Sequence, residues 1–244
     1  MKVISVCNQK GGVGKTTTAL TLQAGLTEKG LRTLLIDLDG QRNSTATKGR
    51  GAETSVYDVL KRGADITEAI SESPTGDYIQ GARELSYIEG LEDTALRDTI
   101  KPLHRKYDIA IIDAPPNLGE LTINALVASD YCIIPAVADK YSGYGMLDLE
   151  RTIKLVRSEY KRPKVMGILL TMHNARLRLS QSMTAELEDI AKELNTTLFD
   201  TSIRYSVKAR EAQFESRGLL QYAPRAPITA DYRAFIAEVI QRLK

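Results

Sequence analysis

A short stretch near the start of the chain crowds glycines, lysines and threonines together. After the apolar residues 3–7, residues 10–18 read Lys-Gly-Gly-Val-Gly-Lys-Thr-Thr-Thr. Glycines allow positive φ angles and a close approach of backbone N–H groups to an anion, and a following helix adds the positive end of its dipole. A lysine then supplies a mobile cation, and a threonine hydroxyl can bind Mg²⁺. This order of parts predicts a loop that holds the phosphates of a nucleotide.

Carboxylates follow two other apolar runs. Asp37 and Asp39 come after the run at 34–36, and Asp113 closes the run at 109–112. Ligands of a parallel sheet bind beyond the carboxyl ends of its strands, so these side chains should lie near the loop. Asp113 is expected to orient the shell of a Mg²⁺ ion, and Asp37 and Asp39 to divide their work between metal-bound water and the attacking water. The predicted metal residues are Thr16, Asp37 and Asp113.

Apolar runs and helical patterns alternate along most of the chain. Residues 16–29 read as a helix, 32–38 as a buried strand and 107–113 as another, and the alternation continues to a closing helix at 229–243. Strands separated by helices imply right-handed crossovers. We therefore predict an α/β fold with a mostly parallel, twisted sheet and helices on both faces. Residues 42–92 are the least legible, and short strands are predicted there at 78–80 and 86–88. A helix is predicted at 94–106 and a strand at 196–199.

Length and composition bound the class of protein. The 244 residues suffice for one large domain, and the formal net charge is only +2. We expect a single domain over 1–244 with no N-terminal DNA-binding extension, no membrane insertion and no signal peptide. The two cysteines, Cys7 and Cys132, stand in apolar runs and read as small core residues in a reducing cytoplasm.

The glycine loop departs from the common phosphate-loop pattern. The first glycine of G-x-x-x-x-G-K-[ST] would fall at Gln9, and an additional cation, Lys10, precedes the glycines. The form K-G-G-x-G-K-[ST]-T resembles the deviant Walker A loop of the ParA/MinD family of ATPases. The resemblance implies a P-loop NTPase fold, ATP and Mg²⁺ as cofactors, and a homodimer that forms on ATP. The ATP-binding residues implied are Lys10, Gly11, Gly12, Val13, Gly14, Lys15, Thr16 and Thr17, with Asn174 near the adenine or the dimer face.

The resemblance also implies catalytic roles. Lys15 holds the phosphates, Asp39 aims the attacking water, and Lys10 reaches the nucleotide of the partner subunit, where it neutralises charge near the leaving oxygen. The family carries D-x-D-P-Q where this chain has Gly40 after Asp39, and we expect this glycine to loosen the turn. Hydrolysis should depend on dimerisation and be slow without a stimulating partner.

Absent features narrow the choice of branch. Two dispersed cysteines cannot ligate an iron–sulfur cluster, and the polar face of the 229–243 helix mixes Asp231 and Glu238 with arginines, unlike a basic membrane anchor. What remains is a partition ATPase that associates with the nucleoid and acts with a centromere-binding, ParB-like protein. Two alternatives stay open: an ATPase that positions another cargo, and a small-molecule kinase or ligase on the same fold.

Basic charge gathers in the second half of the chain. Residues 201–244 hold eight basic and four acidic side chains, whereas residues 53–98 hold four basic and eleven acidic ones. By resemblance, this basic region forms a surface for non-specific DNA, which would bind phosphates rather than read bases. The DNA-binding candidates are Arg204, Lys208, Arg210, Arg217 and Arg225.

Overall fold

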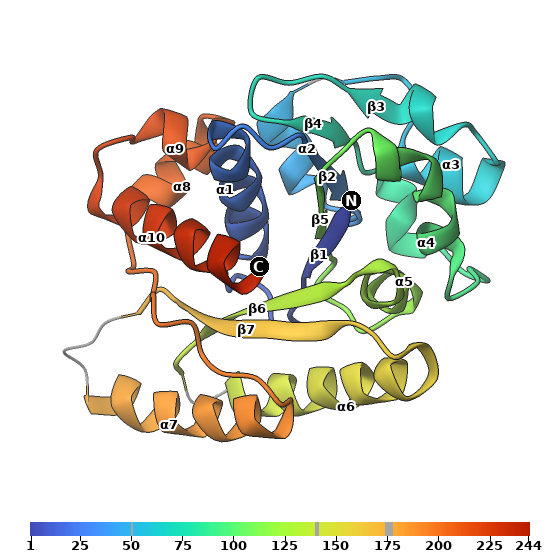
Figure 1. The fold of residues 1–244 in the computed structure, drawn as a ribbon. Coiled ribbons are helices and arrows are strands. Elements are labelled where there is room, and N and C mark those ends of the chain that lie inside the picture. The colour runs from blue at the N-terminus through green and yellow to red at the C-terminus, as the bar shows by residue number, and fades with distance from the viewer. Residues whose placement is uncertain (50, 140–141, 174–177) are drawn as a thin grey trace.

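A computed structural model describes residues 1–49, 51–139, 142–173 and 178–244, without the side chains of 142–145 and 178–183. Within these residues seven strands form one sheet in the order β3-β4-β2-β5-β1-β6-β7 (Figure 1). Only β3, at one edge, is antiparallel to its neighbour. The predicted α/β fold with a mostly parallel sheet is confirmed. The strands are β1 (Lys2–Val6), β2 (Thr33–Asp37), β3 (Ile70–Ser71), β4 (Asp77–Ile79), β5 (Ile109–Asp113), β6 (Tyr131–Val137) and β7 (Lys164–Thr171).

Helices cover both faces of the sheet, as Figure 1 shows. Alternate strand residues point to opposite faces, and the buried residues accordingly form two clusters. One cluster packs against α3 to α7, and the other against α1 and α8 to α10. The α-helices are α1 (Lys15–Glu28), α2 (Asn43–Lys48), α3 (Val56–Arg62), α4 (Ala95–Thr99), α5 (Glu120–Ala128), α6 (Ser142–Tyr160), α7 (Arg178–Glu193), α8 (Val207–Phe214), α9 (Leu219–Tyr222) and α10 (Pro227–Arg242). The 3₁₀ helices are η1 (Ile66–Ala69), η2 (Arg83–Tyr87) and η3 (Lys101–Arg105).

The central strands read as continuous apolar runs because both of their faces are covered. Every residue of β2 and β5 is buried. Their register aligns Asp37 with Asp113 at the carboxyl end. Strand β1 lies on the other side of β5, and its carboxyl end leads directly into the glycine loop. The parallel register therefore brings the loop and both carboxylates to one edge.

Three local predictions were wrong. The strand expected at 86–88 is part of η2, and its Tyr87 is 87% exposed rather than packed in a sheet. The helix expected at 94–106 breaks into α4 and η3, because Pro102 has no backbone N–H for an α-helical hydrogen bond. The strand expected at 196–199 reduces to an isolated bridge between Leu198 and Ile168 of β7.

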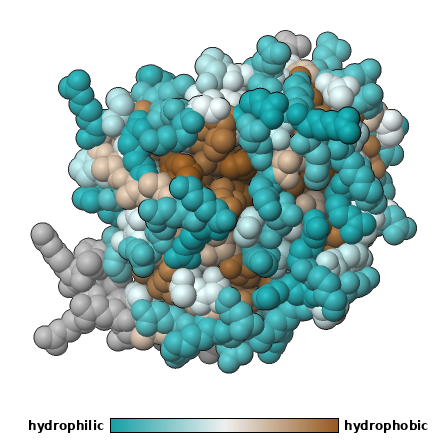
Figure 2. Space-filling model, in the orientation of Figure 1, coloured by the Kyte–Doolittle hydropathy of each residue, from teal (hydrophilic) through white to brown (hydrophobic). Residues whose placement is uncertain are grey.

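The face of the molecule drawn in Figure 2 is mostly hydrophilic. Figure 2 shows one face, on which apolar residues are visible mainly in a central hollow. Among the described residues, no helix combines the length and the apolar character that crossing a membrane requires.

Candidate nucleotide site

The glycine loop joins β1 to α1 and adopts a conformation that only glycine takes easily. Gly12 has φ 76° and Gly14 has φ 88°, both in the left-handed region. Gly14 is also the N-cap of α1, and no side chain caps this helix. The first-turn N–H groups of α1 are therefore open to an anion.

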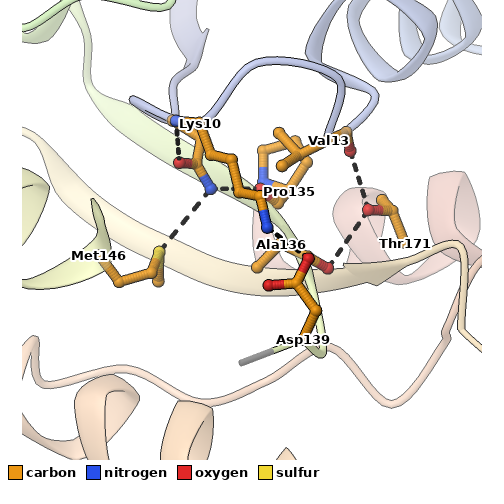
Figure 3. A network of polar contacts seen from close by, with 8 residues as sticks. Lys10, Val13, Pro135, Ala136, Asp139, Met146 and Thr171 are labelled. Carbon is orange, nitrogen blue, oxygen red and sulfur yellow. Dashed lines mark hydrogen bonds and ion pairs between the residues drawn. The ribbon is translucent and has the colours of Figure 1, made fainter. Parts of the chain in front are cut away.

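Two buried side chains anchor the loop to the sheet. The amide Nδ2 of Asn8 donates to the carbonyl of Pro135 at 2.7 Å, and its Oδ1 accepts from the backbone N–H of Lys10 at 2.9 Å. The hydroxyl of Thr171 lies 2.8 Å from the carbonyl of Val13 and 3.2 Å from that of Ala136 (Figure 3). Strands β6 and β7 thus fix both halves of the loop. The sequence analysis missed both anchors, although Thr171 stands at a strand end.

Lys15 sits in the loop with its side chain largely withdrawn from solvent. Its ammonium donates to the carbonyl of Lys10 at 3.1 Å, and the residue is 8% exposed. Burial lowers the pKa of Lys15, while the nearby carboxylates of Asp113 and Asp39 act in the opposite direction. A phosphate here would compensate a positive charge that is already partly desolvated.

Asp113 and Asp37 form a buried acidic pair at the ends of β5 and β2. Burial, followed by the charge of Asp37, raises the pKa of Asp113, and burial likewise raises the pKa of Asp37. The hydroxyl of Ser44 donates to Oδ2 of Asp113 at 2.5 Å, whereas Oδ1 has no hydrogen-bond partner among the described residues. This unpartnered buried oxygen, with Thr16 beside it, fits a place in the shell of a hydrated cation.

Asp37 is engaged differently. Its Oδ1 accepts from the N–H of Asp39 at 3.1 Å, and its Oδ2 accepts from the N–H and the hydroxyl of Thr45 at 2.8 and 2.6 Å. These hydrogen bonds to the Asp37 carboxylate stabilise the turn that follows β2. Its predicted place in a metal shell stays a prediction. Ser44 and Thr45 are functional candidates that the sequence analysis missed, although both follow the Asp-x-Asp turn directly.

Asp39 faces the cavity beside the glycine loop. One of its oxygens accepts from the N–H of Gln41 at 2.9 Å, and its carbonyl accepts from the N–H of Arg42 at 2.9 Å. A Cβ atom on Gly40 would lie 2.0 Å from the hydroxyl oxygen of Ser86, so η2 packs directly on this turn. The turn that we expected to be loose is held by these bonds and by η2.

A cavity of about 410 Å³ lies over the loop. Gly11, Lys15, Thr16 and Asp39 line one end. The other end is lined by the end of β7, the segment 203–206, α8 and α10, and it combines the apolar residues Met172, Ile203, Ala209 and Ile228 with the polar side chains of Arg204, Arg210 and Gln213. The first end can hold the phosphates of a nucleotide, and the apolar side chains of the second end, here called the apolar end, can contact its base.

Lys10 lies outside this cavity's lining and points toward the end of β6. Its ammonium forms an ion pair with the carboxylate of Asp139 (Figure 3). The two side chains are 29% and 39% exposed, so the pair is accessible from solvent. The contact of Lys10 with a partner subunit stays a prediction.

The DNA-binding candidates fall into two groups. Arg204 is bound to Asp231, and Lys208 donates to Glu211 at 2.7 Å. Arg210 and Arg217 instead lie over the rings of Tyr205 and Tyr222, and no ion pair to a carboxylate is found in the described residues for either of them or for Arg225. Asn174, predicted near the adenine, lies outside the described residues.

Comparisons with known proteins place this chain among ATPases of known families. Residues 1–166 match the family model described as an AAA domain. The chromosome-partitioning ATPase Soj of Thermus thermophilus is 35% identical over 246 residues, covering 99% of this chain and 96% of that protein. The chromosome partitioning protein ParA of Caulobacter vibrioides is 34% identical, covering 99% of this chain and 95% of its own.

Solved structures show the same architecture. A cobyrinic acid a,c-diamide synthase from Mycobacterium smegmatis, with bound ADP and magnesium, superposes with a TM-score of 0.84 at 27% identity, covering 100% of this chain and 95% of that one. The cell division ATPase MinD of Pyrococcus furiosus superposes with a TM-score of 0.82 at 20% identity, covering 98% of each chain, and shows the fold alone. From its loop, its fold and its full-length relatives, the chain belongs to the ParA/MinD family of ATPases.

Proposed function

We propose that this chain is an ATPase that dimerises on ATP, binds DNA without sequence preference and segregates plasmid or chromosomal DNA with a centromere-binding, ParB-like partner. The observation that carries the proposal is the glycine loop with two lysines, one buried at the phosphate end of the cavity and one at the surface. Full-length relatives named as chromosome-partitioning proteins support the biological role. In this proposal the protein works in the cytoplasm, on the nucleoid.

The site residues divide the work of binding and hydrolysis. The N–H groups of the loop and of the first turn of α1 bind the phosphates, together with the ammonium of Lys15. Thr16 and Asp113 would hold Mg²⁺, which when bound neutralises charge on the phosphates. Asp39 orients the attacking water, and Asp37 with Thr45 keeps that carboxylate in place. Such catalysis is mostly positioning and charge stabilisation.

In this proposal, Lys10 couples ATP binding to dimerisation. Its ammonium is at the surface beside the loop, where a second subunit could approach. Reaching the partner's nucleotide requires it to leave Asp139. An exposed ion pair contributes little stability, so this release costs little. The DNA surface of the dimer would use the arginines that have no carboxylate partner among the described residues, Arg210, Arg217 and Arg225.

One experiment with three variants tests the proposal. Asp39→Ala should bind ATP, lose turnover and persist as a dimer that binds random duplex DNA at low salt. Lys10→Ala should bind ATP with nearly unchanged affinity but remain monomeric, and Lys29→Ala, an exposed lysine at the end of α1, is the matched control. Light scattering and DNA binding with ATP provide the measurements.

The outcomes separate the candidate functions. An ATP-bound dimer that ignores DNA at low salt would favour the positioning of another cargo. An Asp39→Ala protein that stays monomeric with ATP would contradict the proposed dimer and the role of Lys10 together, and would favour a small-molecule kinase or ligase.

A further inference from the structure

The apolar end of the nucleotide cavity is walled by a segment with few backbone hydrogen bonds. Ile203 donates to the carbonyl of Leu170 at 2.8 Å and accepts from the N–H of His173 at 2.9 Å, which extends the edge of β7. Beyond this point the chain turns toward α8, whose N-cap is Ser206. Residues 203–206 all line the cavity. Their position therefore decides the width of this end.

An ion pair attaches this wall to α10, and the preceding backbone N–H groups of Asp200 and Thr201 donate to Glu238 of the same helix. The backbone N–H and the Nε of Arg204 donate to Oδ2 of Asp231 at 3.1 and 2.7 Å, and Nη2 donates to Oδ1 at 2.7 Å. A bidentate guanidinium–carboxylate pair fixes orientation as well as distance. Asp231 is the more protected partner, with a side chain 13% exposed against 55% for Arg204. Although partial burial acts to raise it, the hydrogen bonds of Arg204 hold the pKa of Asp231 below its ordinary value.

Helix α10 is itself fixed to α1, the helix that begins at the phosphate loop. The hydroxyls of Tyr232 and Thr18 lie 3.3 Å apart. A Cβ atom on Gly25 of α1 would lie only 2.2 Å from Cδ1 of Ile236, so the two helices pack closely. Figure 1 shows α10 lying alongside α1. The phosphate end and the apolar end of the cavity are thus positioned by the same pair of helices.

We propose that Arg204 and Asp231 are positioning residues for the nucleoside part of the bound nucleotide. Their ion pair holds the 203–206 wall at the distance from α10 that a purine base and its sugar require. This inference rests on the proposed function only in taking a nucleoside triphosphate as the ligand. It assigns Arg204 to the nucleotide site and removes it from the DNA surface.

The geometry argues against a DNA contact for Arg204. A DNA phosphate could engage its guanidinium only by displacing the carboxylate of Asp231. That carboxylate is mostly shielded from water and would lose the cation that compensates it. Among the described residues, neither Arg210 nor Arg217 has such a carboxylate partner, and Arg217 also lies outside the lining of the nucleotide cavity, whereas Arg210 is part of it.

The test compares ATP with inorganic tripolyphosphate, which fills the phosphate end alone. Arg204→Gln and Asp231→Asn should each weaken ATP binding several-fold, up to about tenfold, and leave tripolyphosphate binding unchanged. The double variant should bind ATP no more weakly than the single variant of lower affinity, because both changes remove the same contact. Arg233→Gln is the matched control. Arg233 lies on the same helix as Asp231, and the change breaks its exposed ion pair with Glu28 of α1. It should change the affinity for neither ATP nor tripolyphosphate.

DNA binding at saturating ATP supplies the second readout. The proposal predicts that Arg204→Gln and Asp231→Asn bind random duplex DNA as the wild type does. It is overturned if ATP affinity is unchanged, if tripolyphosphate affinity falls in parallel, or if Arg204→Gln alone loses DNA binding. A wild-type protein that binds neither ATP nor tripolyphosphate overturns the proposed function first. Arg204→Lys keeps the positive charge without the planar guanidinium and should show the same selective loss of ATP affinity. This variant replaces Asp231→Asn if that protein does not fold.

Discussion

At the scale of single residues, hydrogen bonds and the packing of η2 stabilise the turn after β2, where the family pattern has a proline. The family pattern has a proline where this chain has Gly40. Here Asp37 and Asp39 bind backbone N–H groups within the turn, and η2 fills the space that a side chain would need. The glycine is required by the neighbouring segment rather than by the turn itself, since only a residue without Cβ allows η2 to pack so closely.

Gly40→Ala should therefore lower turnover. The new Cβ would meet the hydroxyl of Ser86, which can rotate away, and also the backbone nitrogen of Ser86 at 2.9 Å, which cannot. The turn must shift, and with it the carboxylate of Asp39. We expect kcat to fall several-fold with little change in ATP affinity, and Ser86→Ala to restore it only in part. Full activity of Gly40→Ala would show that η2 yields easily.

Thr171→Val should weaken the glycine loop. Valine keeps the shape but removes the hydroxyl that joins Val13 to β6 and β7. Leaving buried carbonyl groups unsatisfied costs about 1–3 kcal/mol of unfolding free energy, measurable by urea denaturation, and ATP affinity should fall as well. Thr171→Ser retains the hydroxyl and serves as the control. Equal behaviour of the two variants would assign the loop's stability to other contacts.

At the scale of elements, α2 connects the turn after β2 to the sheet edge. Thr45, near its start, binds Asp37 and accepts from the N–H of Gly81 at 2.9 Å. Lys48, its last residue, donates to the hydroxyl of Thr75 at 2.8 Å and to the carbonyl of Gly76 at 3.0 Å. The segment after β4 thus binds the start of this short helix, and the segment before β4 binds its end.

The attachment at Lys48 should depend on pH. Burial, opposed by the charge of Asp77, lowers the pKa of Lys48 to about 8 from 10.5. Between these values the unfolded chain binds more protons, so the free energy of unfolding should rise with pH from about 8 to 10.5, by at most about 1.4 kcal/mol per unit. The difference in unfolding free energy between wild type and Lys48→Met, measured in urea at pH 7.5 and 9.5, isolates this contribution. A difference independent of pH would mean that Lys48 titrates normally.

At the scale of the whole molecule, charge is distributed unevenly along the chain. Acidic residues dominate 53–98, and basic residues gather in the last 44 positions. Within that basic region, carboxylates already bind Arg204 and Lys208, whereas Arg210 and Arg217 lie over tyrosine rings. Sequence position alone therefore overestimates the charge available to a polyanion.

The proposed DNA-binding surface can be tested by the salt dependence of DNA binding. Each arginine that neutralises a DNA phosphate should contribute about −0.9 to the slope of log K against log salt concentration. We expect Arg210→Ala, Arg217→Ala and Arg225→Ala each to reduce that slope by about this amount per subunit, and Lys208→Ala to change it less, because Glu211 neutralises this lysine. Titrations of the ATP-bound protein with random duplex DNA measure the slopes. Slopes equal to that of the wild type in all four variants would show that the DNA-binding surface lies elsewhere.

Local motifs by themselves determined much of this protein. The glycine loop, the Asp-x-Asp turn and Asp113 were predicted from contiguous residues, because each follows a buried apolar strand and the carboxyl ends of parallel strands must share an edge. The alternation of strands and helices predicted the fold for the same reason. Predictions failed where no periodic pattern exists, as in η2, or where a single residue decides, as Pro102 does between α4 and η3.

Only the tertiary structure decided which residues hold the site in place. Asn8 with Pro135, Thr171 with Val13, Lys10 with Asp139 and Arg204 with Asp231 are partners distant in sequence. Nothing in the local pattern of an arginine reveals whether a carboxylate from another helix will reach it. The sequence specifies which groups can do chemistry, and the packing of the sheet against its helices determines which of them are free to do it.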